Sequence, residues 1–296
     1  SGVMDATWDP VAYGKSLSRQ PENGRVICFG GSSMAGRPLT PTDSSCQMVS
    51  DALAPRATMV NSASAALDSQ DIRAVMEVAC QHEHRLMLLY TGHNEFLNLK
   101  YFVHESPPEA LSEAAEILSA FRFFRWFQSF DVADTPTAGT LGASTVDNAA
   151  VFERFETNVR AIFEACKGRH LIVSTVVSNA SIRNPQGATL RESYRRGQLK
   201  PVPLHETCRE CFRAPEIINM IIRKLAAEYD VPMVDAEQLL EGTAPETLFW
   251  DHVHPRPELH RRIAEAFLTV AKAAGYLDRF RAPTIEVQQA RLSKAA

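Results

Sequence analysis

Short apolar runs alternate along this chain with longer stretches in which apolar positions recur at helical spacing. The short runs contain few polar positions, a pattern typical of strands that are covered on both faces of a parallel sheet. The predicted strands are Arg25–Gly30, Ala57–Asn61, Arg85–Thr91, His170–Val177 and Val231–Asp235. The predicted helices are 69–81, 149–166, 214–229 and 257–277. This alternation predicts right-handed crossovers and a three-layer α/β/α sandwich.

Helix-capping residues support two of these helices. Asp68 or Ser69 is a suitable N-cap for the first helix, because a short side-chain oxygen can accept from the free backbone N–H groups there. The last helix has Pro257 near its start and Gly275 near its end, which are the positions these residues favour.

We expect one domain over residues 25–280, with an N-terminal extension, 1–24, and a C-terminal tail, 281–296. Two stretches, 97–147 and 178–212, interrupt the alternation and exceed ordinary loop lengths. We interpret both as insertions that form lids, substrate walls or partner surfaces.

Each insertion contains one conspicuous motif. Phe121–Phe127, FRFFRWF, places aromatic residues at helical spacing, which favours packing against the domain. A lid facing an acyl chain is the alternative. Arg191–Lys200 is basic and is interpreted as a solvated loop, with docking of an anionic substrate as the alternative.

Charge and hydropathy limit the classes of partner. Thirty-one basic and 35 acidic residues give a net charge of −4, without the basic stripe of a nucleic-acid-binding protein. The apolar runs are far shorter than the roughly 20 residues that span a bilayer. The opening residues, SGVMDATWDP, contain no apolar signal-peptide core. We expect no nucleic-acid partner and find no support for membrane contact.

Cysteines are scattered through the chain, at positions 28, 46, 80, 166, 208 and 211. This scatter favours buried, reduced thiols over a disulfide framework, and reduced cysteines lean toward a cytoplasmic location, which otherwise stays open. Cys208 and Cys211 form a CxxC motif, but a second pair at zinc spacing is missing. We therefore expect neither a metal nor a redox site there.

Chemistry-bearing residues follow several predicted strands. Parallel sheets bind ligands beyond the carboxyl ends of their strands, so these residues should meet at one edge. Ser32 follows the first strand in GGSSMAG, and Asn94 follows the third in TGHNEF. Asp251 and His254 lie after the fifth strand in FWDHVHP. A serine hydroxyl needs an adjacent base to act as a nucleophile, and a histidine held by a carboxylate supplies one.

Simpler roles exist for each residue taken alone. Ser32 could cap a helix after a glycine turn, and Asn94 could cap a turn. Ser33 is a rival nucleophile whose expected role is helix capping. His252 and His254 could bind zinc together with Asp251, but the histidines are at i, i+2 spacing in a loop that lacks a third strong ligand nearby. The joint placement at one sheet edge favours catalysis over these alternatives.

These motifs together resemble the SGNH hydrolase superfamily, the GDSL-type esterases and lipases, from about residue 25 to residue 275. Gly30-Gly31-Ser32 stands where the family has Gly-Asp-Ser, and NSASAALD, residues 61–68, stands where the second block supplies a glycine N–H. Gly92-His93-Asn94-Glu95 matches the third block, Gly-x-Asn-Asp. Asp251-His252-Val253-His254 matches the Asp-x-x-His block.

The resemblance implies a flavodoxin-like sheet with strand order 2-1-3-4-5 and a Ser32–His254–Asp251 triad. It assigns the oxyanion hole to the N–H groups of Ser32 and Ala66 and the side-chain amide of Asn94. Ala66 replaces a glycine there, but it still has an N–H. By the same resemblance, Gly31 and His93 border the substrate. His252 is expected to be a bystander, because its side chain and that of the adjacent Asp251 would tend to diverge in an extended segment.

The expected function is serine-dependent hydrolysis of a carboxylic ester, with an O-acetyl or short acyl group on a small molecule or glycan. We expect no cofactor and no metal. Acyl transfer to an alcohol or sugar through Ser32 is one alternative, and a catalytically weak binding module is another. The sequence does not identify the acyl group, the alcohol or the oligomeric state.

Overall fold

The computed structural model describes most of the predicted domain but leaves several segments out of the description. The described residues are 10–18, 25–36, 43–54, 57–64, 67–81, 86–98, 148–179, 191–195, 198–202, 209–244, 247–250 and 253–280. The motif at 121–127, the proposed donor Ala66 and the pair Asp251–His252 lie outside these ranges.

A five-stranded parallel sheet with strand order β2-β1-β3-β4-β7 forms the centre of the fold. Its strands are β1 (Arg25–Gly30), β2 (Thr58–Asn61), β3 (Leu86–Tyr90), β4 (Leu171–Ser174) and β7 (Met233–Val234). Every residue of β1, β3 and β4 is buried, as the non-alternating apolar pattern predicted. The predicted fold class and strand order are confirmed.

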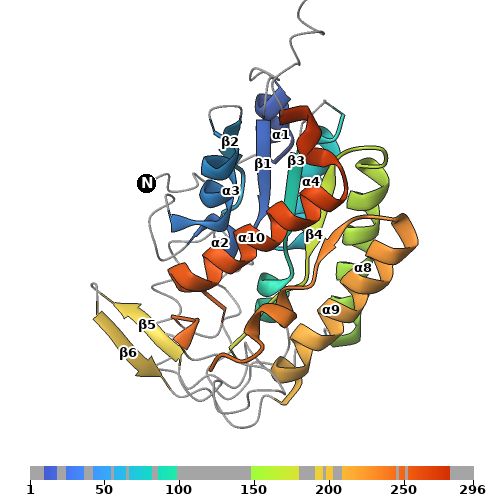
Figure 1. Ribbon diagram of the computed structural model, residues 1–296. Coiled ribbons are helices and arrows are strands. Elements are labelled where there is room, and N and C mark those ends of the chain that lie inside the picture. Colours follow the sequence, from blue (N-terminus) through green and yellow to red (C-terminus); the bar gives the residue numbers. More distant parts are fainter. Residues whose placement is uncertain are drawn as a thin grey trace, which may run out of the picture.

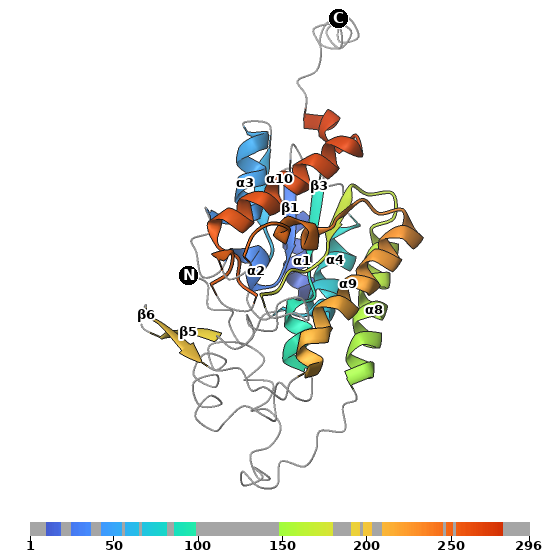
Figure 2. The same ribbon diagram turned by 60° about the horizontal axis from the view of Figure 1, so that its bottom comes forward.

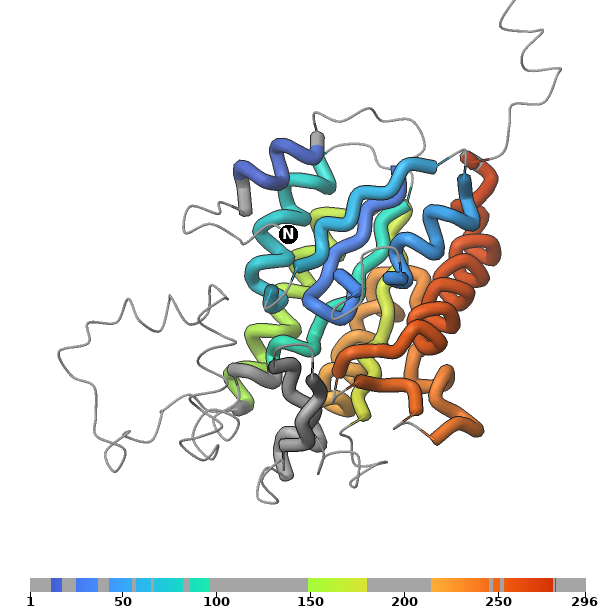
Figure 3. The backbone as a smooth tube through the Cα atoms, turned by 90° about the vertical axis from the view of Figure 1, so that its left-hand side faces the viewer, coloured from blue at the N-terminus to red at the C-terminus, as the bar shows by residue number. Residues whose placement is uncertain are grey.

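Helices cover both faces of this sheet. One layer contains α1 (Pro10–Ser18), α4 (Ser69–Ala79), α8 (Asn148–Ala165) and α9 (Arg209–Tyr229). The other contains α3 (Ser45–Leu53) and α10 (Pro257–Ala273). Figure 3 shows α3 and α10 on one side of the strands and α1 with α4 on the other. The crossovers are those expected of a doubly wound sheet, in which the first and later connections lie on opposite faces.

Two predicted helix boundaries are confirmed. Asp68 is the N-cap of α4, and its carboxylate accepts from the N–H groups of Gln70 (2.9 Å) and Asp71 (3.1 Å). Pro257 is the first residue of α10, and Gly275 follows the helix with a φ of 72°. Helix α1, within the segment expected to be an extension, packs against α4.

Within the second insertion the structure describes an antiparallel hairpin, β5 (Arg191–Arg195) and β6 (Gln198–Val202). Figure 1 shows it apart from the central sheet. None of the helices in the described ranges is long and apolar enough to cross a membrane.

The prediction of reduced cysteines is wrong for four of the six. Cys28 of β1 is bonded to Cys46 of α3, and Cys80 after α4 is bonded to Cys166 after α8. The paired cysteines are 18 and 86 residues apart in sequence. The packing of helices against strands brings their Cα atoms to 6.1 Å and 5.2 Å, distances that a disulfide can span. The argument for a cytoplasmic location therefore loses its basis, since disulfides persist mainly in oxidising compartments.

Candidate active site

Ser32 lies where the sheet rule placed it, directly beyond the carboxyl end of β1. Gly31 is extended (φ −84°, ψ −160°), and Ser32 begins the short helix α2 (Ser32–Ala35). Gly36 ends that helix with a left-handed φ of 84°, a conformation that favours glycine. A sharp strand–turn–helix connection therefore presents the Ser32 side chain, which is only partly buried.

His254 meets Ser32 across 222 residues of sequence. Its Nε2 lies 2.8 Å from the Ser32 Oγ, within hydrogen-bond distance. In Figure 2, α2 and the segment leading into α10 lie side by side at the same end of the sheet. The structure thus brings together the predicted serine and the predicted histidine, at the separation that proton transfer requires.

A narrow backbone loop holds His254. Phe249 and Pro255 form an antiparallel bridge, and Trp250 N–H donates to the His254 carbonyl at 2.9 Å. The guanidinium of Arg256 donates to the Phe249 carbonyl at 2.7 Å and lies 4.2 Å from the centroid of the Trp250 ring. These contacts connect residues 249 and 250 with residues 254 to 256; residues 251 and 252 lie outside the description.

Ser33 links the helix that carries Ser32 to the loop that carries His254. Its buried hydroxyl donates to the Val253 carbonyl at 2.9 Å, which ties α2 to the loop before His254. The expected capping role of Ser33 is therefore not the contact that the structure shows. Sequence reasoning missed this link because a single serine carries no signal of a partner 220 residues away.

Asn94 lies in the 3₁₀ segment η2 (His93–Asn98) that follows β3, and its side chain is 9% exposed. Its Nδ2 donates to the Leu67 carbonyl at 2.6 Å. A Cβ on Gly31 would lie 2.5 Å from the same nitrogen, so the amide packs against the residue before Ser32. The family's usual aspartate at position 31 could not fit this arrangement unless Asn94 moved.

His93 is 5% exposed, and its contacts are with the interior. Its Nε2 lies 3.1 Å from the Val177 carbonyl, and its ring contacts Tyr90 edge to face with centroids 4.7 Å apart. A role at the substrate, which the family resemblance implies, would require this ring to act from a largely buried position.

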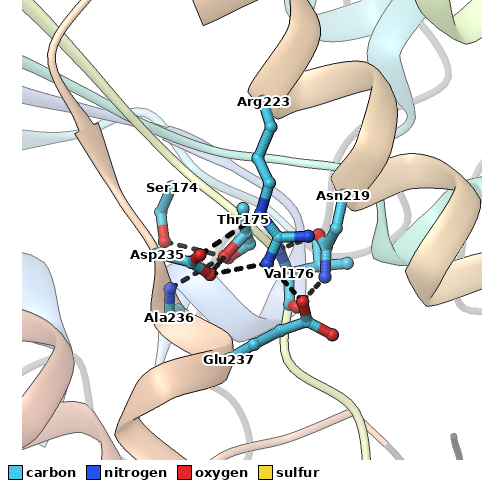
Figure 4. A network of polar contacts seen from close by, with 8 residues as sticks. All are labelled: Ser174, Thr175, Val176, Asn219, Arg223, Asp235, Ala236 and Glu237. Carbon is cyan, nitrogen blue, oxygen red and sulfur yellow. Dashed lines mark hydrogen bonds and ion pairs between the residues drawn. The ribbon is translucent and has the colours of Figure 1, made fainter.

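A polar network holds the segment after β4, which includes the Val177 carbonyl that His93 contacts (Figure 4). Asn219 of α9 pairs with both backbone groups of Val176, at 2.7 and 2.9 Å. Arg223 donates to Asp235 at 2.8 Å, and Thr175 donates to the same carboxylate at 3.2 Å. The network joins the carboxyl ends of β4 and β7 to α9, and so it holds the segment after β4 in place.

A second serine–histidine pair lies deeper between α3 and α10. The Nδ1 of His260 is 2.8 Å from the Ser45 Oγ and 3.3 Å from the Ser45 backbone nitrogen. Burial, and then the nearby His254, lower the pKa of His260 to about 4, against the opposing effect of Asp43. Sequence reasoning did not single out this pair, because neither residue belongs to a recognisable motif.

The structure adds no candidate ligands to the zinc alternative among the residues it describes. Within the described residues, no group of three or more His, Cys, Asp or Glu side chains is placed to hold a metal ion. Two members of the zinc alternative, Asp251 and His252, lie outside the description.

Comparisons with known proteins show which family and which solved structures this chain resembles. Residues 26–267 match the GDSL-like lipase/acylhydrolase family. A lipolytic protein of the G-D-S-L family from Veillonella parvula is similar in structure over 84% of this chain and 98% of its own, with 14% identity and a TM-score of 0.51. An acetylxylan esterase from Geobacillus stearothermophilus is similar over 84% and 96%, with 14% identity and a TM-score of 0.50. A search of curated protein sequences gave no significant match.

Proposed function

The chain belongs to the GDSL-like lipase/acylhydrolase family, a family of ester hydrolases, and we propose that it cleaves a carboxylic ester with Ser32 as nucleophile and His254 as general base. One observation carries the assignment of these two residues, the 2.8 Å contact between Ser32 Oγ and His254 Nε2 at the carboxyl edge of the sheet. The family resemblance supplies the third member of the proposed triad, Asp251.

The proposed reaction has two steps. In the first, Ser32 Oγ attacks the ester carbonyl carbon while His254 Nε2 takes the hydroxyl proton. The same proton then passes to the leaving alkoxide, and an acyl-serine remains. In the second step, water attacks the acyl-serine, His254 takes a proton from the water, and the proton returns to Ser32 as the acid leaves. Asp251 would hold the other imidazole nitrogen and stabilise the imidazolium.

The proposed oxyanion hole combines the N–H groups of Ser32 and Ala66 with the Asn94 amide. An amide NH₂ has two donor hydrogens. One hydrogen of Asn94 is used by the Leu67 carbonyl, which orients the amide and leaves the second hydrogen for the substrate oxygen. Each such donor lowers the barrier by about 3 kcal/mol in enzymes of this mechanism.

We infer that the substrate is an O-acetyl or short-acyl ester of a small molecule or glycan. The structural neighbour from Geobacillus stearothermophilus is described as an acetylxylan esterase, so acetylated xylo-oligosaccharides are a reasonable first substrate to test. The proposal includes no cofactor and no metal, because a serine–histidine pair needs neither to cleave an ester.

A p-nitrophenyl acetate assay tests this function. Wild type should turn over, Ser32→Ala should lose at least about 10³-fold in kcat, and Ser33→Ala should keep most of its activity. A fluorophosphonate should label the peptide that contains Ser32. Labelling of Ser33, or full activity of Ser32→Ala, would contradict the assignment of the nucleophile. Product analysis with added sugar acceptors would separate hydrolysis from acyl transfer.

A further inference from the structure

Glu95 is a buried acid beside the proposed oxyanion amide. It directly follows Asn94 in η2, and its side chain is 1% exposed. One carboxyl oxygen, Oε1, accepts from the Ser69 backbone N–H at 2.6 Å. The other, Oε2, is buried and has no hydrogen-bond partner among the described residues. Such a group is costly to keep in an interior, so its retention calls for an explanation.

Asn94 and Glu95 hold two nearby points of one backbone segment. Asn94 Nδ2 donates to the Leu67 carbonyl, and Glu95 Oε1 accepts from the Ser69 N–H, both at 2.6 Å. Ser69 is the first residue of α4, where backbone N–H groups have no partner within the helix. The Asp68 carboxylate caps the next two of these groups. The start of α4 and the residues leading into it are therefore attached to the end of β3.

We propose that Glu95 is a positioning residue for the oxyanion hole, acting through the start of α4 on the segment before it. That segment includes Leu67, whose carbonyl accepts from Asn94 Nδ2 and so orients the Asn94 amide. This inference rests on the proposed function, because it assigns Glu95 a role in placing Asn94, one of that site's proposed donors.

Opposing effects act on the protonation of the Glu95 carboxyl. Burial, and then the charge of Asp68, raise the pKa of Glu95 to about 7, while its hydrogen bonds to Ser69 and the charge of Arg154 act in the opposite direction. A carboxylate accepts from an N–H more strongly than a neutral oxygen does. A neutral acceptor of the same reach would still keep the contact, which provides a conservative variant.

Two substitutions of Glu95 separate positioning from packing. Glu95→Leu keeps the bulk but removes the acceptor, and we expect kcat for p-nitrophenyl acetate to fall at least tenfold with KM changed less than about threefold. Glu95→Gln keeps an oxygen for the Ser69 N–H and should recover at least about a third of wild-type kcat. Glu77→Leu, on the exposed side of the same helix, is the control and should match wild type. Active sites are counted by fluorophosphonate labelling, so that kcat refers to folded enzyme.

A double substitution tests whether Glu95 acts through the oxyanion hole. In an Asn94→Ala background, Glu95→Leu should cost less than about threefold, because the donor that it helps to place is already gone. If the Glu95→Leu variant does not fold, Ser69→Pro removes the same hydrogen bond from the other side. Proline is favoured at the first helical position, and Asp68 is already extended, as a residue before proline must be.

The outcomes distinguish this inference from the proposed function. If wild type does not hydrolyse the ester, or if Ser32→Ala is fully active, the proposed function fails. If wild type is active and Ser32-dependent but Glu95→Leu or Ser69→Pro keeps its kcat per labelled site, the positioning role of Glu95 is wrong. Equal losses in Glu95→Leu and Glu95→Gln, or a full additional loss in the Asn94→Ala background, would also overturn it.

Discussion

Two serine–histidine hydrogen bonds of equal length lie in the described part of the chain, and they differ in almost every other respect. Ser32 Oγ and His254 Nε2 are 2.8 Å apart at the sheet edge, where both side chains are partly exposed. Ser45 Oγ and His260 Nδ1 are also 2.8 Å apart, but these residues are 2% and 0% exposed. Distance alone therefore does not identify a nucleophile.

The difference lies in what surrounds each imidazole. His254 contacts the serine through Nε2, and in the proposed triad the orienting carboxylate would hold its Nδ1. His260 uses Nδ1 for both the hydroxyl and the backbone N–H of Ser45, so this nitrogen is an acceptor and the ring is neutral with its proton on Nε2. That Nε2 is buried and has no partner among the described residues. We interpret the deeper pair as a connection between α3 and α10.

The largest contrast is expected between the two histidines. His254→Ala should lower kcat by about 10³-fold or more, because the proposed general base would be lost. His260→Asn should keep kcat within about threefold, because that ring is fully buried between α3 and α10 and contacts Ser45. The measurement is p-nitrophenyl acetate turnover per folded molecule at pH 8. Comparable losses in both variants, with both folded, would break the distinction between the pairs.

The next contrast is within the loop before α10. Asp251→Ala should lower kcat by about 10²- to 10⁴-fold, because the imidazole of His254 would lose the carboxylate that we propose orients it. His252→Ala should cost less than about tenfold. The same assay measures both. If His252→Ala were as inactive as His254→Ala while both stayed folded, the assignment of the base within this motif would be wrong.

Acid should act on the buried pair through stability. His260 is neutral in the folded state down to about pH 4, whereas the unfolded chain protonates it near 6.5. The unfolded state therefore binds more protons between these values, and stability falls as pH drops from about 6.5 toward 4, by at most about 3 kcal/mol. Urea unfolding over this range should show a shallower dependence in His260→Asn. An identical pH slope in the two proteins would refute this.

The smallest contrast concerns the residues that precede the two serines. Gly31→Ala should lower kcat about tenfold, because the new Cβ would lie 2.5 Å from Asn94 Nδ2 and displace the amide. Ser44 instead caps α3, accepting from the Gln47 N–H at 3.2 Å. Ser44→Ala should leave kcat unchanged and lower the free energy of unfolding by about 1 kcal/mol. A kcat unaffected by Gly31→Ala would mean that Asn94 tolerates the shift.

Much of the fold could be predicted because strand burial leaves a direct trace in sequence. Arg25–Gly30 was predicted with its correct bounds, since a strand covered on both faces is apolar without alternation. The strand predicted at His170–Val177 ends at Ser174. Beyond it, the backbone of Val176 makes both its hydrogen bonds to the Asn219 side chain of α9 instead of to a neighbouring strand. No pattern in the nearby sequence predicts this contact.

The site divides in the same way. The meeting of Ser32 and His254 could be predicted, because the sheet rule places loops after parallel strands at one edge. The Ser33–Val253 bond, the Ser45–His260 pair and the Glu95–Ser69 bond could not be predicted. Each is a single polar contact between distant segments, and such contacts have no period and no spacing. The disulfides were missed for the same reason.

The bond between Cys80 and Cys166 has a consequence for how the chain behaves when it is cut. Its two cysteines are 86 positions apart and enclose the whole first insertion, residues 97–147. A protease that hydrolyses any single peptide bond between them produces two fragments that stay covalently joined. The nicked protein would migrate as one species on a non-reducing gel and as two after reduction. Ser32 would lie on the first fragment and His254 on the second, with the bridge still linking them.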